Sequence, residues 1–478
     1  MSLNKILRLV IIAAVAAGLV WLIISRPEQL APSAAVAPFP QSLPEVEEAP
    51  LGRRQLDIQS WTTAAGSRVL FVQTEQIPML YARLVFNAGS ARDGDHAGLA
   101  MLTNAMLDQG ADGLDVAALA RGFEDLGARL GNSSHRDMAL LTLATLSAPE
   151  FRDPALALLT RILARPDFPA GELARMKTQQ LQALQRQKQV PGPQLSDAYN
   201  RALFGDHPYG IPSNGTEQSL PGIEPAQLAV FYRQYYTAGN AVIALVGDLS
   251  KTDAKRIAEQ LSSALPTGER APELPPAAAL TEARQQHIEF PSTQTHILLG
   301  NQMIDRHHPD YPALYVGNKI LGGGDFSAIL MDEVRQKRGL VYGIYSSISP
   351  MAAAGPFTVS LQTANANAHD ALVLTRQLIA DFVANGPSEE QLKLAQDDLV
   401  GSYALSTASN SDIVAQLGVI GFYDLPLSYM DDFQQALQQV TAEQVRGAFR
   451  RHLHPDTLLT VSIGPHDPNQ AAAEDSAP

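Results

Sequence analysis

The sequence predicts an α+β fold in which two similar halves, each of roughly 200 residues, follow one N-terminal transmembrane helix. At 478 residues, with 45% hydrophobic and 18% charged residues, the chain is globular and too long for one ordinary core. Strand-like runs rich in Val, Leu and Phe alternate with helical periodicity on both sides of residues 266–276, which contain four prolines. Each half also has a strongly apolar strand followed by glycine, at residues 240–246 and 458–463.

The charge and the cysteine content exclude several functional classes. The formal net charge of −14 argues against a nucleic-acid-binding surface. The chain contains no cysteine, which excludes disulfides, thiolate metal sites and cysteine nucleophiles. A chain without thiols also suits an oxidising compartment.

The N-terminus has the pattern of a membrane-targeting segment. Residues 9–24 are all apolar, with Lys5 and Arg8 before them and Arg26 after them. This pattern is found in cleavable secretory signals and in uncleaved anchors, and no small-x-small cleavage site follows directly. We therefore predict an anchor at residues 1–26 that spans the membrane through residues 9–25 and leaves the N-terminus in the cytoplasm. In a bacterium this orientation makes the chain a single-pass inner-membrane protein with its body in the periplasm.

A proline-rich linker precedes the first half. Residues 27–53 hold six prolines and cannot bury a core, so they form a semi-rigid periplasmic tether. The first domain is predicted over residues 54–270. Its expected elements are strands at 68–74 and 79–87, a helix from 97, a turn at 131–134, a strand at 138–147, helices at 153–164 and 170–189, a strand at 240–246 and a helix at 252–265.

The second domain is predicted over residues 285–466, after an inter-domain linker at residues 271–284. Residues 467–478 form a polar, acidic tail that we expect to be disordered. The expected elements of the second domain are a strand near 295–299, a helix at 311–321, a glycine-rich turn, a helix ending at Lys337, strands at 341–348 and 357–363, further helices and a strand at 458–463.

Several short segments of the first half occur in a characteristic order. They are NAGSARD at residues 87–93, LGARLGN at 126–132, FGDHPYG at 204–210 and VGD at 246–248. Their order and spacing resemble those of peptidase family M16, the pitrilysin-like or inverzincin metallopeptidases. The resemblance covers nearly all of residues 55–265. It implies two M16-type (LuxS/metallohydrolase-like) α+β halves that form half of a clamshell chamber.

The resemblance also implies a zinc motif that this chain lacks. In register with the family's H-x-x-E-H motif stand Met101, Leu102, Thr103, Asn104 and Ala105. Two histidines four residues apart bind zinc from one helix face, and the glutamate activates the bound water. Met101 and Ala105 cannot bind zinc in that way, and Asn104 cannot accept a proton. The third family ligand, a Glu, would fall near Leu181, and no Glu lies between residues 172 and 217. We therefore expect no catalytic residue and no metal in this chain.

The second half carries another family element. LGGG at residues 321–324 and EVRQKRGLVY at 333–342 resemble the segment that holds the family's Arg/Tyr substrate-binding pair. By this resemblance the pair is Arg335 and Tyr342, which would face a zinc helix across the chamber and hold the substrate main chain. Guanidinium and phenol suit this task because both donate hydrogen bonds to an oxygen that gains negative charge. Without the resemblance, Arg335 would be a solvated helix residue and Tyr342 a half-buried strand residue.

The resemblance implies an incomplete enzyme, because the chain lacks the zinc motif but keeps the Arg/Tyr pair. The resemblance implies a non-catalytic, Arg/Tyr-bearing subunit of a heterodimeric M16B zinc peptidase, inactive alone. Its expected partners are an H-x-x-E-H-containing M16 subunit, which would hold the zinc, and a peptide substrate. The alternative is an M16-fold scaffold or peptide-binding protein with no role in proteolysis. An independent metalloenzyme with a relocated site is not favoured, because no His/Asp/Glu cluster has ligand spacing.

Overall fold

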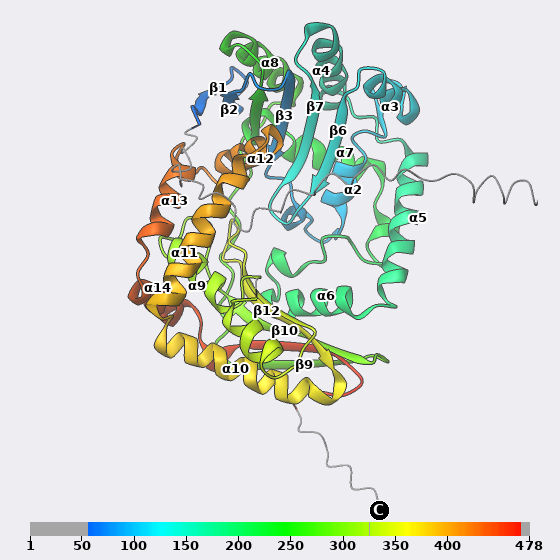
Figure 1. Cartoon of the computed structure of the whole chain (residues 1–478). Helices are drawn as coiled ribbons and strands as arrows, with labels where there is room; N and C mark the ends of the chain where they lie inside the picture. The colour runs from blue at the N-terminus through cyan, green and yellow to red at the C-terminus, as the bar shows by residue number, and fades with distance from the viewer. Residues whose placement is uncertain (1–55, 325, 470–478) are drawn as a thin grey trace, which may run out of the picture. The chain divides into compact units, whose positions relative to one another are not determined.

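Two mixed β-sheets, one from each half of the chain, organise the fold (Figure 1). The computed structural model describes residues 56–324 and 326–469. The anchor predicted at residues 1–26, the tether at 27–53 and most of the tail at 467–478 lie outside the described residues. Among the described residues, no helix is both long and apolar enough to span a bilayer. The sheets and the helices between them confirm the predicted α+β class.

The first sheet has the strand order β1-β2-β8-β3-β7-β6. β8 runs parallel to β2 and antiparallel to β3, so the last strand of this half lies between two of the first. The strands are β1 (Gln59–Thr62), β2 (Arg68–Gln73), β3 (Met79–Phe86), β6 (Arg129–Ser134), β7 (Ala139–Leu146) and β8 (Ala241–Gly247), and the separate ribbon is β4 (Gly110–Ala111) with β5 (Leu114–Asp115).

The second sheet repeats this arrangement with the order β11-β12-β10-β13-β9. β13 runs parallel to β9 and antiparallel to β10, so it lies between them as β8 lies between β2 and β3. The same insertion of the final strand in both sheets is the structural counterpart of the repeat in the sequence. The strands are β9 (Arg284–Glu289), β10 (Gln294–Gln302), β11 (Gly343–Ile348), β12 (Pro356–Ala364) and β13 (Leu459–Gly464).

Helices of the same half cover one face of each sheet. Phe71, Leu84 and Leu245 of the first sheet are buried in a core shared with α2, α4, α7 and α8, and Leu299 and Val359 are buried with α9, α10 and α14. The helices are α2 (Leu99–Ala105), α3 (Val116–Glu124), α4 (Pro149–Ala164), α5 (Ala170–Gln187), α6 (Pro191–Phe204), α7 (Pro225–Tyr235), α8 (Lys251–Ala264), α9 (Tyr311–Leu321), α10 (Ala368–Asn385), α11 (Glu389–Tyr403), α12 (Asn410–Phe422), α13 (Tyr429–Gln439) and α14 (Ala442–His452).

Each half also sends one helix to the opposite sheet. β8 and β13 are buried at every residue, so these strands need cover on both faces. α12 of the second half packs Ile413, Leu417 and Ile420 against the outer face of the first sheet (Figure 1). In return, α6 of the first half packs Tyr199 and Leu203 against the second sheet. The two halves therefore complete each other's cores.

A buried carboxylate also links the halves. Asp137, after β6, accepts hydrogen bonds from the Tyr209 hydroxyl at 2.5 Å and from the Tyr423 hydroxyl at 3.0 Å. The backbone N–H of Ala352 donates to the same carboxylate at 2.8 Å, and that of Ala353 donates to the Tyr209 hydroxyl at 3.0 Å. A charge that is only 4% exposed requires such partners. Three of these five residues belong to the second half, so the network fixes one half to the other.

Most predicted elements are confirmed, and the differences have local causes. The helix expected at residues 311–321 is α9, and the strand expected at 68–74 is β2. The turn expected at residues 131–134 is wrong, because these polar residues pair with β7 as the edge strand β6. The chain instead reverses where the His135 N–H bonds the Met138 carbonyl at 2.8 Å. α6 was not expected because it starts at Pro191, yet proline is well tolerated in the first turn of a helix.

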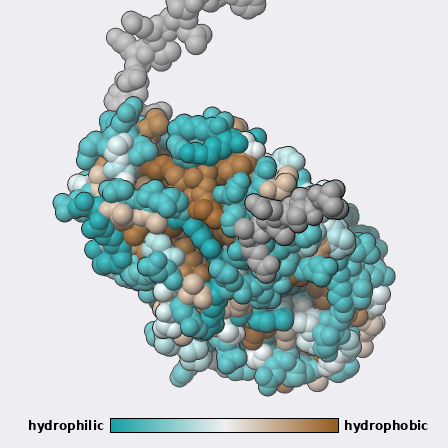
Figure 2. Space-filling model, turned by 90° about the horizontal axis from the view of Figure 1, so that it is seen from below, coloured by the Kyte–Doolittle hydropathy of each residue, from teal (hydrophilic) through white to brown (hydrophobic). Residues whose placement is uncertain are grey.

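Some large apolar side chains remain exposed. On the face seen from below, hydrophobic side chains gather near the centre and hydrophilic side chains surround them (Figure 2). A contiguous apolar surface of this kind is typical of a site of interaction. Over the whole described surface, the large hydrophobic side chains that are at least half exposed are Ile77, Val230, Phe326, Tyr342, Val373, Leu394 and Leu405.

We predict that Leu417→Ala lowers the free energy of unfolding by about 2–5 kcal/mol, because it opens a cavity between α12 and the first sheet. The loss is measured from the midpoint of urea unfolding. Leu394→Ala, on the exposed side of α11, is the matched control and should change stability by no more than about 0.5 kcal/mol. Equal effects of the two variants would show that α12 does not stabilise the first half.

Candidate functional site

The helix that corresponds to the zinc motif is α2, and its polar residue is structural. The Asn104 side chain is 1% exposed. Its Nδ2 donates to the Tyr236 hydroxyl at 3.2 Å and to the Leu140 carbonyl at 3.3 Å. The Asn132 side chain in turn donates to the Asn104 carbonyl at 3.2 Å. Asn104 therefore joins α2 to β6, β7 and the end of α7.

The other positions of the degenerate motif lie among apolar side chains. Met101 is half-buried and packs against the core of the first half, as does Leu181 of α5 at the position expected for the third ligand. Ala105, the last residue of α2, has no group that could bind a metal. An ion placed beside these residues would lose its hydration without gaining a ligand. The side chains at these positions do not fit zinc.

A glycine and a buried carboxyl fix the start of α2. Gly98 precedes it with a φ of 92°, and a Cβ at this position would lie 2.8 Å from the Cα of Gly215. The carboxylate of Asp93 accepts hydrogen bonds from the N–H groups of Gly98 and Ala100, both at 2.7 Å. Burial raises the pKa of Asp93 to about 7, although these two N–H donors act in the opposite direction. A buried, titrating carboxyl therefore holds the start of the degenerate helix.

Arg335 and Tyr342 lie on adjoining elements of the second half, away from the half that holds α2. Arg335 is in the π-helix η5 (Met331–Gln336), and Tyr342 directly precedes β11. η5 packs against β11, whereas α2 packs against α7, β6 and β7. The structure thus does not bring Arg335 and Tyr342 together with Met101, Asn104 and Ala105 through these contacts.

Of the expected pair, Tyr342 is exposed, whereas Arg335 is partly buried and donates from one terminal amino group to Met331 Sδ at 3.8 Å. Tyr342 is 58% exposed, and Arg335 stacks its guanidinium over the exposed ring of Phe326, 5.4 Å from the ring centroid. A cation over an aromatic face is attracted electrostatically, which orients the guanidinium without using its N–H donors. The neighbouring charges pair among themselves, because Glu333 binds Lys337 and Arg338. Sequence reasoning missed Phe326 because an isolated aromatic residue in a turn carries no signal.

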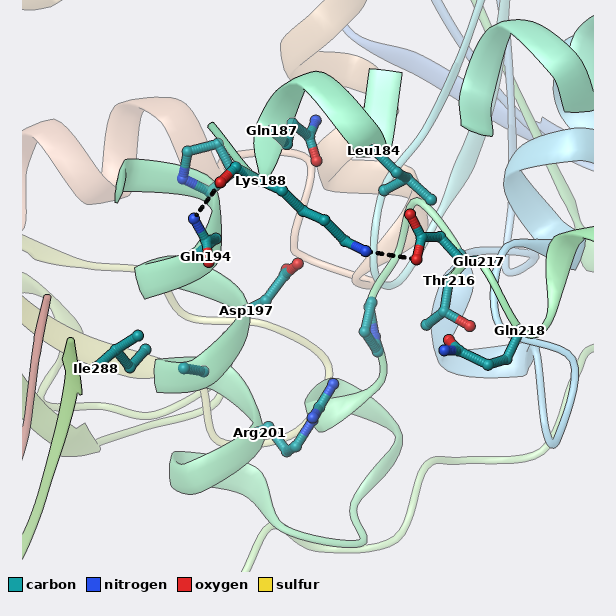
Figure 3. A pocket seen from close by; sticks show the side chains of 14 residues that line it. Leu184, Gln187, Lys188, Gln194, Asp197, Arg201, Thr216, Glu217, Gln218 and Ile288 are labelled. Atoms are coloured by element: carbon teal, nitrogen blue, oxygen red, sulfur yellow. Dashed lines mark hydrogen bonds and ion pairs between the residues drawn. The ribbon is translucent and has the colours of Figure 1, made fainter. Parts of the chain in front are cut away.

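A cavity of about 400 Å³ lies between α5, α6 and residues 212–218 (Figure 3). Asp197 and Arg201 of α6 point into it, and Lys188 reaches across it to Glu217, with Nζ 2.5 Å from Oε2. Burial raises the pKa of Asp197, which Arg201 partly offsets. The cavity can accommodate polar or zwitterionic groups. Sequence reasoning missed it because α6 itself was not expected.

One cluster of metal-binding residue types is brought together in the described part of the chain. It consists of His308, Asp310 and His452. Asp310 also accepts from Arg451 at both carboxylate oxygens, at 2.8 and 2.9 Å, and from His452 Nε2 at 2.8 Å. The carboxylate is thus already ion-paired, and the cluster joins the start of α9 to the end of α14. It was not expected because its members are far apart in the sequence.

We predict that Asn104→Ala lowers the free energy of unfolding by about 1–3 kcal/mol, because the buried Tyr236 hydroxyl loses its partner. The loss is measured by urea unfolding. Tyr236→Phe and the double variant complete a cycle, and the coupling between the two positions should be about 1 kcal/mol. Strictly additive losses would show that this hydrogen bond does not contribute.

We also predict that Asp93→Asn changes the pH dependence of stability. Between the ordinary value of 3.8 and about 7, the folded chain keeps a proton on Asp93 that the unfolded chain has released. The stabilisation from this carboxyl is therefore complete below the lower value and is lost as pH rises through the upper one. The stability of the variant relative to the parent should accordingly rise across this range, as measured by unfolding at several pH values. A constant difference would contradict the assignment.

Comparison with known proteins identifies a family for both halves of the chain. Residues 68–217 match the model of the insulinase family, peptidase family M16, and residues 222–399 match the model of the peptidase M16 inactive domain. A zinc protease from Mycobacterium tuberculosis, named as uncharacterized, is 29% identical over 279 residues. That match covers 58% of this chain and 63% of the relative, so the chain spans less than two thirds of it.

Two further relatives match over more of their length. The non-peptidase homolog YmxG of Helicobacter pylori is 24% identical over 399 residues, which cover 83% of this chain and 91% of that protein. The crystal structure of a peptidase M16 inactive domain from Pseudomonas fluorescens is 49% identical, with a TM-score of 0.84, over 86% of this chain and 99% of that one. With both M16 models matched in order and this relative covered almost completely, the chain belongs to peptidase family M16, as a homologue without the family's zinc motif.

Proposed function

We propose that this protein is the non-catalytic, Arg/Tyr-bearing subunit of a heterodimeric M16B zinc peptidase. Its partner is an M16 subunit with an intact H-x-x-E-H motif, and zinc resides in that partner. Arg335 and Tyr342 contribute substrate binding by holding the main chain of a peptide beside the partner's metal. In isolation, this chain does not hydrolyse peptides.

One observation supports the proposal: the same chain lacks the side chains of the zinc motif but keeps those of the substrate-binding pair. Met101 packs against the core, Asn104 is buried and hydrogen-bonded, and Ala105 has no side-chain donor atom, so these positions leave no metal ligand. In contrast, Tyr342 is exposed and Arg335 is partly exposed, so a peptide can reach donor groups of both residues. A phenol and a guanidinium can stabilise an oxyanion only next to a nucleophile that this chain lacks. A second subunit that supplies the nucleophile makes these residues useful.

The proposed location follows from the N-terminal sequence. Residues 9–24 form the apolar segment of an uncleaved anchor, and Lys5 and Arg8 keep the N-terminus in the cytoplasm. The proline-rich residues 27–53 then place the two domains, over residues 54–270 and 285–466, in the periplasm as half of a clamshell chamber. The absence of cysteine is compatible with this compartment.

The second candidate is a scaffold or peptide-binding protein without a role in proteolysis. The names of two relatives favour this candidate, since one is called a non-peptidase homolog and the other an inactive domain. In that case the exposed apolar surface would hold a structural partner or a peptide. The two candidates differ in what co-purifies with the chain from its native membranes. An H-x-x-E-H peptidase in equal amount supports the first, and a homodimer without peptidase activity supports the second.

We predict that Tyr342→Phe slows peptide hydrolysis by the assembled complex about 10²-fold, because a donor to the oxyanion is lost. Peptide turnover is measured at saturating partner, and partner affinity is measured separately and should not change. Tyr345→Phe removes the hydroxyl of a neighbouring exposed tyrosine and should leave turnover as in the parent chain. Unchanged turnover in Tyr342→Phe would exclude the proposed role.

A further inference from the structure

A second cavity, of about 340 Å³, lies between the first sheet and α12. Its walls come from β3, β7, the β6–β7 turn and α12, together with Met351 of the second half. None of the residues of the proposed peptide-binding pair lines it. Its volume falls within the range of small-molecule sites. The residues that line it combine cations with apolar side chains, and this combination indicates what the cavity can bind.

Arg83 of β3 is one of the two arginines that line the cavity. Its Nε donates to the Thr142 hydroxyl at 3.0 Å, and its terminal amino groups have no hydrogen-bond partner among the described residues. Burial lowers the pKa of Arg83, and no acidic side chain counteracts this effect. The aliphatic stem is held against α12, since a Cβ on Gly418 would lie 3.3 Å from Arg83 Cδ. A partly desolvated guanidinium with free donors favours a bound anion.

The other charged side chains that line the cavity do not pair with Arg83, so the anion would have to come from a ligand. Arg136 lines the cavity as a second cation, and its Nε donates to the Tyr209 carbonyl at 3.2 Å. Asp137 is the acidic residue of the lining, and both of its oxygens already accept hydrogen bonds from Tyr209, Tyr423 and Ala352. His135 and Tyr423 also line the cavity, and the Tyr423 hydroxyl donates to Asp137. The cavity therefore has an excess of donors and positive charge.

The rest of the wall is apolar. It is formed by Val85, Met138, Leu140, Met351 and Val419. Methionine side chains adapt to ligands of different shape, and the lining includes one from each half of the chain, Met138 and Met351. A fully hydrated anion such as phosphate would lose its water against this wall without compensation. A ligand with one anionic end and an apolar body satisfies both parts of the cavity.

We propose that this cavity binds a carboxylate joined to an apolar chain, with the carboxylate paired to Arg83 and the apolar part between the two methionines. Arg83 can engage both oxygens of the carboxylate through its terminal amino groups. Both a fatty-acid anion and the C-terminus of a peptide with an apolar last residue have this chemistry. The proposal goes beyond the subunit role and does not depend on it.

The test is NMR of the full-length chain labelled with ¹³C at its methionine methyl groups, titrated with octanoate. The Met138 and Met351 signals should shift in a saturable manner, while that of Met176, outside the cavity, should not. Octanamide, which has the same chain without the charge, should bind at least about 10-fold more weakly. Absence of a saturable shift up to roughly 10 mM octanoate, or equal affinity for octanamide, would overturn the proposal.

Variants distinguish a specific carboxylate site from non-specific binding of octanoate. Arg83→Gln should weaken octanoate binding at least about 10-fold, whereas Arg121→Gln, on the exposed surface of α3, should leave it unchanged. Ala415→Phe keeps Arg83 but fills the cavity from α12, so it should abolish the shifts while the remaining methionine signals stay as in the parent chain. Retained binding in Arg83→Gln and Ala415→Phe would contradict the proposed site.

A final comparison identifies the source of the ligand. N-acetyl-leucyl-leucine and its C-terminal amide are titrated in the same way as octanoate and octanamide. Tighter binding of the peptide acid supports the site as a receptor for peptide C-termini, and tighter binding of octanoate supports it as a fatty-acid site. Failure of both acids overturns the carboxylate assignment.

Discussion

The structure depends on one constraint: β8 and β13 are buried on both faces, but the helices of the same half cover only one face of each sheet. Without the helix from the other half, β8 would expose Val242, Ala244 and Val246, and β13 would expose Leu459, Val461 and Ile463. The exchange of α6 and α12 between the halves covers the second face of both sheets. Gly421 of α12 shows how close the contact is, because a Cβ there would lie 2.3 Å from Val242 Cγ1. Neither half has a complete core without the other.

The exchanged helices also determine where the cavities lie. α6 contributes Asp197 and Arg201 to the cavity beside α5, and α12 contributes Ala415 and Val419 to the cavity beside β3. A helix from one half cannot match the other half's sheet over its full width, so space remains at its margins. Both of these spaces are lined by charged residues. The helices that stabilise the junction between the halves therefore also line these two cavities.

The degenerate zinc helix illustrates how a catalytic position becomes a structural one. A histidine or glutamate kept at α2 without a metal would be a buried polar group without a partner. Met101 avoids this cost by joining the core, and Asn104 avoids it by bonding to Tyr236 and Leu140. Arg335 and Tyr342 are under no such constraint, because the surface hydrates them. The helix could thus change its chemistry while the fold around it stayed intact.

Much of this could be predicted from the sequence because it depends on local patterns. The α+β class, the final strand of each half, α9 and the loss of the zinc motif follow from periodicity, glycine positions and residue types at Met101 and Asn104. The edge strand β6 was mistaken for a turn because polar residues suit both. The exchange of α6 and α12, the network around Asp137 and the unpaired Arg83 were decided only by tertiary structure. Each depends on residues far apart in the chain, and local propensity carries no information about which distant surface a helix or a charge will meet.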